Sequence, residues 1–318
     1  MRLPDNIYLN NCKIFHQLYK NKFTLDVINT VHVGSKGSNM KCKYQVITAT
    51  KDVVFSYYDA VVLDAIYTIY KMDYSKFTLT DLIRVMAVDE KVRFYCTKDG
   101  IQKREQRLRD SVHRLMYTSI IIDYSEEVKL RELKDENDRP LNGKVNDYLA
   151  PIVEEKNGKV FWFLEGRELP LYKYAESIRQ IICVPKEMLS LTDLGLSFSN
   201  TDEIILLKRI LLQRLEIMKN SKNNMDGRTI RYYGVKPEEG ILPMADIHKE
   251  NFAKEEKFVS DRGAVRFESR SWKNKVHNVN QKICAILDAY KKCGYLAEYR
   301  LIRNEIRGLV RGVEIELK

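Results

Sequence analysis

The segment from Arg270 to Leu317 constrains the fold of this chain most tightly. Its apolar residues recur at steps of three and four, which predicts one buried stripe along an amphipathic helix. These residues are Val276, Val279, Ile283, Ile286, Leu287 and Tyr290. Gly294 is suited to end that helix as a C′ residue. Beyond it we predict a strand from Tyr295 to Leu301, a basic turn from Arg303 to Arg311 and a last strand from Val313 to Leu317.

Polar side chains that can bind nucleic acid crowd the first turns of this predicted helix. Lysine reaches phosphates, whereas Asn, Gln and Lys reach base edges in the major groove. The candidate DNA-binding residues are Lys273, Asn274, Lys275, His277, Asn278, Gln281 and Lys282 on the helix and Arg303, Arg307 and Arg311 in the turn. Helix, strand, basic turn and strand is the order of a recognition helix and its β-wing. Taken alone, the segment also fits an ordinary amphipathic helix with a solvated polar face.

The charge balance favours a polyanionic partner. The formal net charge is +10 and the pI is near 9.1, and the basic residues cluster in predicted helices and turns. Nucleic acid therefore fits better than an anionic membrane surface. No run approaches the ~18 apolar residues of a membrane span, and the N-terminus lacks the apolar core of a signal peptide. The six cysteines form no CxxC pair, as in a cytoplasmic protein with reduced thiols. We therefore expect no membrane association.

The first half of the chain predicts three helices followed by a hairpin. Ser56 and Asp59 cap an apolar helix over residues 59–71, a short helix follows over 81–88, and a third covers 98–117. The third helix adds Lys103, Arg104 and Arg107 as candidate DNA contacts. We predict a strand over 119–124, then a hairpin that joins 128–130 to 159–163 around a long loop at 134–159. Three helices and a hairpin make a winged helix.

The second half repeats this plan. Thr201, Asp202 and Glu203 open an apolar helix over 204–218, a charged helix is expected over 244–257, and the helix at Arg270 comes third. Each third helix runs into a similar strand, 119–124 in one half and 294–299 in the other. We predict an α+β, predominantly helical fold with two tandem winged-helix domains and short β-wings. Its parts are a strand-rich extension at 1–50, a first domain at 51–195 and a second at 196–318.

The run IICVPKEMLSLTDLGLSFSNTDEIILLKRILLQRLEIMKN, residues 181–220, resembles the join between domains in tandem winged-helix plasmid replication initiators. In that family a strand and an "IP-x-E-x-L" segment lead to the capped first helix of the second domain. The resemblance implies that the third helix of the second domain enters the major groove of repeated origin sites. It also implies that the first domain serves mainly in dimerisation and partly in DNA contact. The first 50 residues, the 134–159 loop and an insertion at 222–268 depart from the family plan.

Sequence motifs for catalysis or cofactor binding are absent. The five histidines are far apart, so they offer neither the paired histidines of a metal-dependent nickase nor the HxxR of a tyrosine recombinase. There is no P-loop, no HExxH and no Cys/His cluster for zinc. We expect no catalytic residues, no metal and no cofactor, and therefore a binding protein rather than an enzyme.

The leading hypothesis is a sequence-specific binder of double-stranded DNA that initiates replication of a plasmid or mobile element. It would bind origin repeats, be able to form a homodimer, and recruit the host helicase or initiator proteins. The alternatives are a winged-helix transcriptional regulator of a mobile element, a non-catalytic protein-interaction scaffold, and an enzyme with an unrecognised site.

Overall fold

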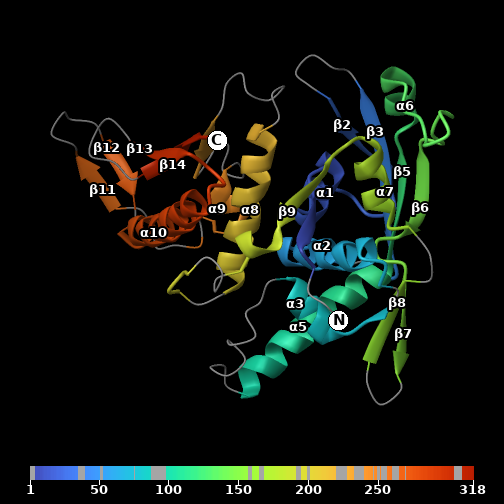
Figure 1. Ribbon diagram of the computed structural model, residues 1–318, viewed down its shortest axis with the longest axis horizontal. Coiled ribbons are helices and arrows are strands. Elements are labelled where there is room, and N and C mark those ends of the chain that lie inside the picture. The colour runs from blue at the N-terminus through green and yellow to red at the C-terminus, as the bar shows by residue number, and fades with distance from the viewer. Residues whose placement is uncertain are drawn as a thin grey trace. The chain divides into compact units, whose positions relative to one another are not determined.

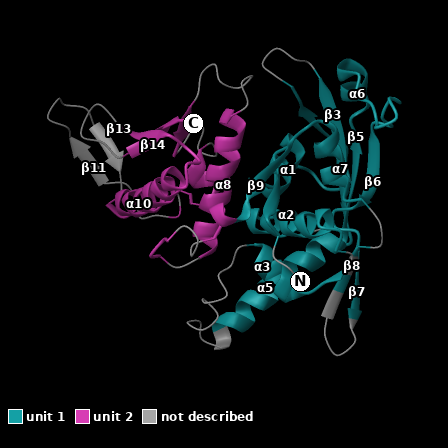
Figure 2. Ribbon diagram, in the orientation of Figure 1, with its two compact units in different colours: residues 1–186 teal, residues 187–318 magenta. Residues whose placement is uncertain are grey.

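The computed structural model divides the chain into two compact units, residues 1–186 and 187–318 (Figure 2). Figure 1 shows the elements along the chain. The described residues are 4–34, 40–50, 53–74, 76–86, 98–156, 160–164, 168–190, 195–198, 201–219, 228–232, 240–245, 247–248, 251, 256–259, 265–268, 270–303 and 310–318. Within these ranges, no helix has both the length and the apolar content needed to cross a membrane.

Unit 1 is built around α2 (Tyr57–Lys71), which is buried on nearly all sides. A helix with apolar residues all round belongs in a core. Its N-terminus is fixed by Asp59, whose carboxylate accepts hydrogen bonds from the Ser56 amide (2.7 Å) and the Ser56 hydroxyl (2.9 Å). The same carboxylate accepts bonds from Ser111 (2.7 Å) and Arg114 (2.7 Å) on α5 (Lys98–Met116). Asp59 therefore caps α2 and joins it to α5.

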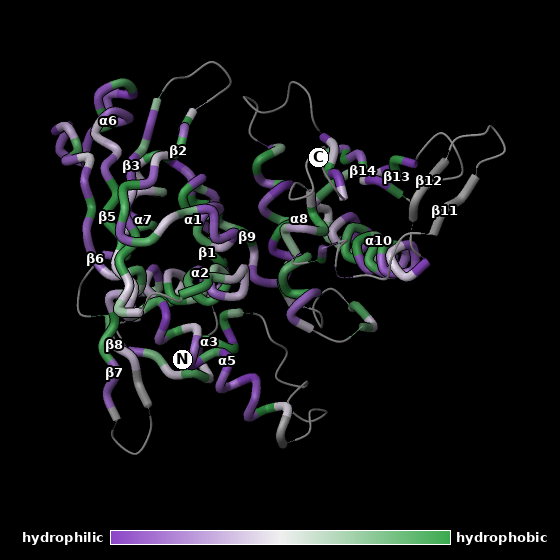
Figure 3. The backbone as a smooth tube through the Cα atoms, turned by 180° about the vertical axis from the view of Figure 1, so that it is seen from behind, coloured by the Kyte–Doolittle hydropathy of each residue, from purple (hydrophilic) through white to green (hydrophobic). Residues whose placement is uncertain are grey.

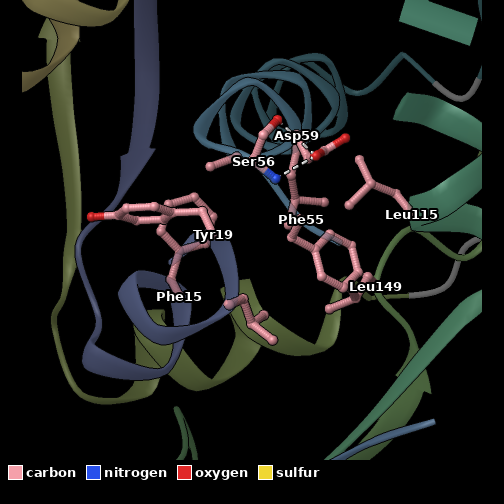
Figure 4. Close-up of a pocket in the computed structure, with 10 residues that line it drawn as sticks. Phe15, Tyr19, Phe55, Ser56, Asp59, Leu115 and Leu149 are labelled. Carbon is pink, nitrogen blue, oxygen red and sulfur yellow. Dashed lines mark hydrogen bonds between the residues drawn. The ribbon is translucent and has the colours of Figure 1, made fainter. Parts of the chain in front are cut away.

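A small cavity of about 20 Å³ adjoins this cap (Figure 4). Figure 4 shows Phe15, Tyr19, Phe55, Leu115 and Leu149 around it, with the Ser56–Asp59 hydrogen bonds at its polar end. The cavity has room for about one water molecule, which is far too little for a small-molecule ligand. It is a packing void of the core.

Three antiparallel sheets cover the helices of unit 1. The four-stranded sheet has the order β2-β3-β5-β6, the three-stranded sheet the order β4-β8-β7, and β1 pairs with β9. The strands are β1 (Asn6–Asn10), β2 (Asn29–His32), β3 (Lys41–Thr48), β4 (Lys76–Phe77), β5 (Thr118–Asp123), β6 (Lys144–Tyr148), β7 (Ile152–Lys156), β8 (Val160–Leu164) and β9 (Ile181–Pro185). The remaining helices are α1 (Lys13–Tyr19), α3 (Leu79–Val85), α6 (Ser125–Arg131), α7 (Pro170–Ser177) and the 3-10 turn η1 (Lys186–Met188), whose last residues open unit 2.

Several sequence predictions for unit 1 need correction. Residues 128–130, expected as a strand, lie in α6, and the hairpin is formed instead by β7 and β8. The stretch expected as a long loop, 134–159, contains β6 and β7. The first 50 residues are strand-rich as expected, but they are no separate extension, because β1 pairs with β9 and β3 with β5. The units divide at residues 186 and 187, whereas the predicted boundary was 195.

Unit 2 contains α8 (Asp202–Lys219), β10 (Thr229–Arg231), α9 (Ile241–Met244), the hairpin β11 (Glu256–Val259) and β12 (Val265–Glu268), α10 (Arg270–Lys292), β13 (Glu298–Arg303) and β14 (Val310–Glu316). Its three-stranded sheet has the order β10-β14-β13. The helix predicted over 244–257 is wrong, since α9 ends at Met244 and β11 begins at Glu256. The helices predicted at 204–218 and from Arg270 are confirmed as α8 and α10.

The two units share one order of elements. In each, a long helix leads to a short strand, a short helix, a long helix and two strands that close an antiparallel sheet on the first strand. The sheets β4-β8-β7 and β10-β14-β13 have the same strand order. Insertions differ: β5, α6 and β6 follow α5 in unit 1, whereas β11 and β12 precede α10 in unit 2. The predicted equivalence of 119–124 with 294–299 is therefore wrong, because β5 pairs with β3 and β6 instead of joining the shared sheet.

Gly312 allows β10 to approach β14 closely. A Cβ atom there would lie 2.5 Å from the Ile230 carbonyl oxygen and 3.2 Å from the Arg231 Cα. Both contacts are with backbone, so no side chain can turn aside. We expect Gly312→Ala to lower the free energy of unfolding by about 1–3 kcal/mol, measured by urea denaturation. Glu314→Ala, at an exposed position of the same strand, should change it by less than about 0.5 kcal/mol. Equal midpoints for the two variants would contradict this account.

Candidate nucleic-acid interface

The helix α10 is held in place by its apolar stripe and by a defined C-terminus. Trp272, Val276, Val279, Ile283, Ile286, Leu287 and Tyr290 are among its buried residues. The helix ends in a Schellman motif, in which Gly294 has φ +71° and its amide donates to the Lys291 carbonyl (2.9 Å). The Tyr295 amide donates to the Tyr290 carbonyl (2.8 Å), as that motif requires. The prediction that Gly294 ends this helix is confirmed. In Figure 3 purple and green alternate along α10, as expected for an amphipathic helix.

The face of α10 opposite the buried stripe carries neutral polar side chains. Asn274, His277, Asn278 and Gln281 are all exposed, and their spacing of three, one and three places them on adjoining rows of one helix face. Within the described parts of the chain, none of these four side chains makes a hydrogen bond or an ion pair. Arg270 is exposed at the start of the same face. Amide donors and acceptors thus face solvent from a rigid helix.

One flank of α10 carries two lysines that the protein itself engages. Lys275 Nζ lies 2.6 Å from Glu203 Oε2, and Lys282 Nζ lies 3.1 Å from Glu203 Oε1. Glu203 is in the first turn of α8. Burial by itself raises the pKa of Glu203, but the hydrogen bonds and charges of the two lysines outweigh burial and hold that pKa below its ordinary value. The sequence prediction assigned both lysines to DNA phosphates, and nothing in the sequence pattern linked them to an acid more than seventy residues away.

The opposite flank of α10 is bonded to the sheet. Asn280 Oδ1 accepts a hydrogen bond of 2.6 Å from the hydroxyl of Tyr232, the buried residue that follows β10. Burial raises the pKa of this tyrosine well above its ordinary value, so the hydroxyl stays a donor at neutral pH. Lys273, also a candidate DNA contact, is half-buried near this flank and has contacts within the protein. Tyr232 and Asn280 therefore fix the rotation of α10 about its axis.

The predicted basic turn from Arg303 to Arg311 begins at the end of β13 and reaches the start of β14, and residues 304–309 between them lie outside the described residues. Arg303 ends β13 and Arg311 is the second residue of β14, and both side chains are exposed. Arg307 lies outside the described residues. Two further exposed arginines, Arg231 on β10 and Arg300 on β13, were missed by the sequence analysis. The alternation of Arg300 with apolar neighbours in EYRLIR was the available signal for an outward-facing residue on a strand.

In unit 1 two of the three candidate residues of α5, Lys103 and Arg107, are exposed one turn apart, and the third, Arg104, is half-buried. Arg104 lies one turn before the buried Leu108. The Arg107 guanidinium lies 4.0 Å from the centroid of the Tyr58 ring, a cation–π contact. Arg114 bonds to the buried Asp59. The basic character of α5 is thus used partly to hold α5 against α2.

No cluster of three or more His, Cys, Asp or Glu side chains that could hold a metal occurs among the described residues. The described cysteines Cys12, Cys42, Cys183, Cys284 and Cys293 form no disulfide. Burial raises the pKa of the Cys12 thiol to about 12, which makes it a poor nucleophile at neutral pH.

Comparisons with known proteins give distant structural likenesses. No protein-family model matches the chain, and no curated protein matches it. A crystal structure of selenomethionine derivatives of domains 2 and 3 of RctB is similar to it, with 12% identity over 96% of this chain and 98% of that chain, and a TM-score of 0.34. A crystal structure of RctB domains 2-3, residues 155–483, matches 65% of this chain and 67% of that chain at 12% identity, with a TM-score of 0.28. The chain itself has a mixed fold of helices and antiparallel sheets.

Proposed function

We propose that the chain is a sequence-specific double-stranded DNA-binding protein that initiates replication of a plasmid or mobile element. In this proposal each unit contains a winged-helix domain, and α10 is the helix that reads DNA. The protein acts by binding rather than by catalysis, and it needs no cofactor.

The shared order of elements supports two winged-helix domains. A winged helix has three helices and a small antiparallel sheet, whose last two strands form the wing. In unit 2 the corresponding elements are α8, α9 and α10 with the sheet β10-β14-β13, and in unit 1 they are α2, α3 and α5 with the sheet β4-β8-β7. The β13–β14 and β7–β8 hairpins would be the two wings.

The exposed amides of α10 carry the proposal. Asn and Gln donate and accept in pairs that match the N6 and N7 positions of adenine in the major groove. Asn274, Asn278 and Gln281 face solvent on a helix whose rotation is fixed by its core and by Tyr232. A merely solvated helix face in a soluble protein is usually rich in charged residues. On α10 the centre of the exposed face carries neutral side chains, and the cations lie at its edges.

Phosphate contacts would come from the exposed cations around this face. Arg303 ends β13, Arg311 is the second residue of β14, and Arg270 opens α10. Lys273 and Arg307 are further candidates from the sequence. In unit 1, Lys103 and Arg107 are exposed, although Arg107 also contacts the Tyr58 ring, and Arg104 is half-buried.

The role in replication rests on the join at residues 181–220 and its resemblance to plasmid replication initiators. Under this proposal the cytoplasmic protein binds repeated origin sites, forms a homodimer through unit 1, and recruits a host helicase or initiator protein. Unit 2 supplies sequence recognition.

Selection of binding sites from a random duplex library, followed by salt titration of binding to the selected site, tests the proposal. We expect one enriched sequence and a linear fall of log K with log salt concentration. A site found as direct repeats beside the gene supports an initiator, whereas a promoter palindrome supports a transcriptional regulator. Failure to shift any duplex at low salt would contradict DNA binding and favour an interaction scaffold. Nicking of supercoiled plasmid in Mg²⁺ would indicate an enzyme.

A single amide on α10 should affect sequence preference alone. We expect Asn278→Ala to weaken binding to the selected site by about 1–3 kcal/mol, or roughly 5- to 150-fold, while the slope of log K against log salt is unchanged. Fluorescence anisotropy with selected and scrambled duplexes measures both quantities. Asn146→Ala, which removes an exposed amide from β6 of unit 1, is the matched control and should leave both unchanged. Equal losses on selected and scrambled duplexes would assign Asn278 to the backbone instead.

A further inference from the structure

Glu203 lies where a phosphate group would have to lie to bind Lys275 and Lys282 together. Its two carboxylate oxygens each contact one lysine, at 2.6 Å and 3.1 Å. A carboxylate and a phosphate present the same chemistry to an ammonium group, namely anionic oxygens at hydrogen-bond distance. The two lysines are spaced by seven residues, which places them on one row of α10, two turns apart.

The side chains of this ion-pair cluster are also partly buried, which makes their contacts persistent. The side chains of Lys275, Lys282 and Glu203 are 26%, 31% and 24% exposed, respectively, so each is largely covered yet still reachable from solvent. Fully exposed ion pairs contribute little, because water and salt screen them. A half-covered pair is screened less, and a competing anion can still reach it.

From this geometry we infer that Glu203 competes with DNA phosphates for Lys275 and Lys282, and so suppresses binding that is independent of base sequence. The inference rests on the proposed function. Binding to any duplex is driven by lysines and arginines that replace counterions at phosphates, and this contribution carries no sequence information. Two lysines held on the carboxylate oxygens of Glu203 are withdrawn from this contribution. The neutral amides Asn274, Asn278 and Gln281 remain free to read bases. Glu203 therefore determines specificity without touching DNA.

Pairing with Glu203 changes how much Lys275 and Lys282 contribute to DNA binding. As freely solvated cations, each would add about 0.9 to the slope of log K against log salt. While they are paired with Glu203, removing one of them costs little affinity for random duplex. Removal of Glu203, in contrast, should change the affinity for random duplex strongly, because both lysines are released at once.

Glu203→Gln is the direct test, because it keeps the size of the side chain and removes its charge. We expect binding to scrambled duplex to show a slope steeper by about 1.8, the contribution of two additional phosphate contacts. At 0.1 M salt its affinity for scrambled duplex should rise by roughly ten- to sixtyfold, since each contact contributes about eightfold between 1 M and 0.1 M salt. Affinity for the selected site should rise less, so the ratio of specific to non-specific binding should fall.

Two further variants separate release of the lysines from a simple gain of charge. Glu216→Gln removes a carboxylate from the same helix α8, where Glu216 pairs with Lys219 at 2.7 Å, and it should leave the slope within about 0.3 of wild type. The triple variant Glu203→Gln, Lys275→Gln, Lys282→Gln should return the slope to the wild-type value. Circular dichroism melting of each variant establishes that it is folded. Should Glu203→Gln not fold, Glu203→Asp, whose shorter side chain can bridge only one lysine, should steepen the slope by about 0.9.

The outcomes distinguish this inference from the proposed function. If wild-type protein binds duplex DNA and Glu203→Gln has the wild-type slope, the inference is overturned and the proposed function stands. The same holds if Glu216→Gln steepens the slope as much as Glu203→Gln does. If neither the wild type nor any variant binds duplex at low salt, the proposed function itself fails.

Discussion

Replacing Asp59 with alanine should lower the free energy of unfolding of unit 1 by about 3–5 kcal/mol, a loss typical of breaking a buried ion pair by removing one partner. The side chain of Asp59 is 2% exposed, whereas that of Arg114 is 32% exposed, so solvent compensates part of the loss and the lower end of the range is expected. The change also leaves the hydroxyl of the buried Ser111 without its acceptor. Because these bonds join α2 to α5, both helices should lose protection together.

Urea denaturation followed by tryptophan fluorescence and by amide hydrogen exchange measures this effect. Trp162 on β8 is fully buried and reports on unit 1, whereas Trp272 reports on unit 2. The matched control is Asp81→Ala at the N-terminus of α3, where Asp81 accepts a bond of 2.9 Å from the Thr78 amide in a similar capping box. Asp81 is only half-buried, so we expect the ~1 kcal/mol of an ordinary cap there. Similar losses at Asp59 and Asp81 would show that Arg114 and Ser111 contribute nothing beyond capping.

Replacing Asn274, Asn278 and Gln281 together by alanine should reduce binding at the selected site to the level of scrambled DNA. Three amide contacts at about 1–3 kcal/mol each cover the usual gap of about 4–10 kcal/mol between specific and non-specific binding. All three residues are exposed, and alanine has the highest helix propensity, so the helix should be as stable as before. Affinity for scrambled duplex should be unchanged, because no phosphate-binding cation is removed.

Asn280→Ala is the matched control for the triple variant. It removes an amide from the same helix, but from the flank where Asn280 accepts a bond from Tyr232. The buried tyrosine hydroxyl would lose its acceptor, so stability should fall by about 1–3 kcal/mol. The preferred DNA sequence should stay the same, because this side chain does not face solvent with the other three. Repeating the site selection with each variant measures the preferred DNA sequence. An altered preference for Asn280→Ala would show that the bases are read by a different side of α10 from the one proposed.

Local sequence signals predicted the helices well. The stripe from Val276 to Tyr290, the cap at Ser56 and the glycine at 294 each act within one or two helical turns, and all three occur as expected. In each case the information lies within a few residues, because capping and amphipathic burial are short-range effects.

Strand pairing could not be predicted in the same way. The similarity of residues 119–124 to 294–299 suggested equivalent strands, yet β5 pairs with β3, whose paired residues lie 70 to 80 positions earlier. The hairpin of unit 1 that pairs with β4 is formed by β7 and β8 instead. A strand pattern shows which side of a strand is buried, but it does not name the partner, which long-range packing selects.

In the candidate site, too, the local features could be predicted from the sequence and the long-range contacts could not. The exposure of Asn274, His277, Asn278 and Gln281 follows from the helical period alone. The engagement of Lys275 and Lys282 depends on Glu203 in another helix, and that of Arg107 depends on Tyr58. A lysine or arginine on a polar face is equally suited to an ion pair, a ring or a phosphate, so its partner emerges only in three dimensions.

The pairing of β1 with β9 separates the order of synthesis from the order of folding. Asn6 lies opposite Pro185 and Asn10 opposite Ile181, so β1, which is made early in unit 1, has its partner at the end of that unit. During translation β1 must remain without that partner while nearly the whole unit is made, and an unpaired strand edge invites association with other chains. Helix α2 limits this exposure, because Asp64 accepts a bond of 2.9 Å from the Asn10 amide and can hold β1 before β9 is made. A strand made early in unit 1 is thus paired only after the end of the unit has been made.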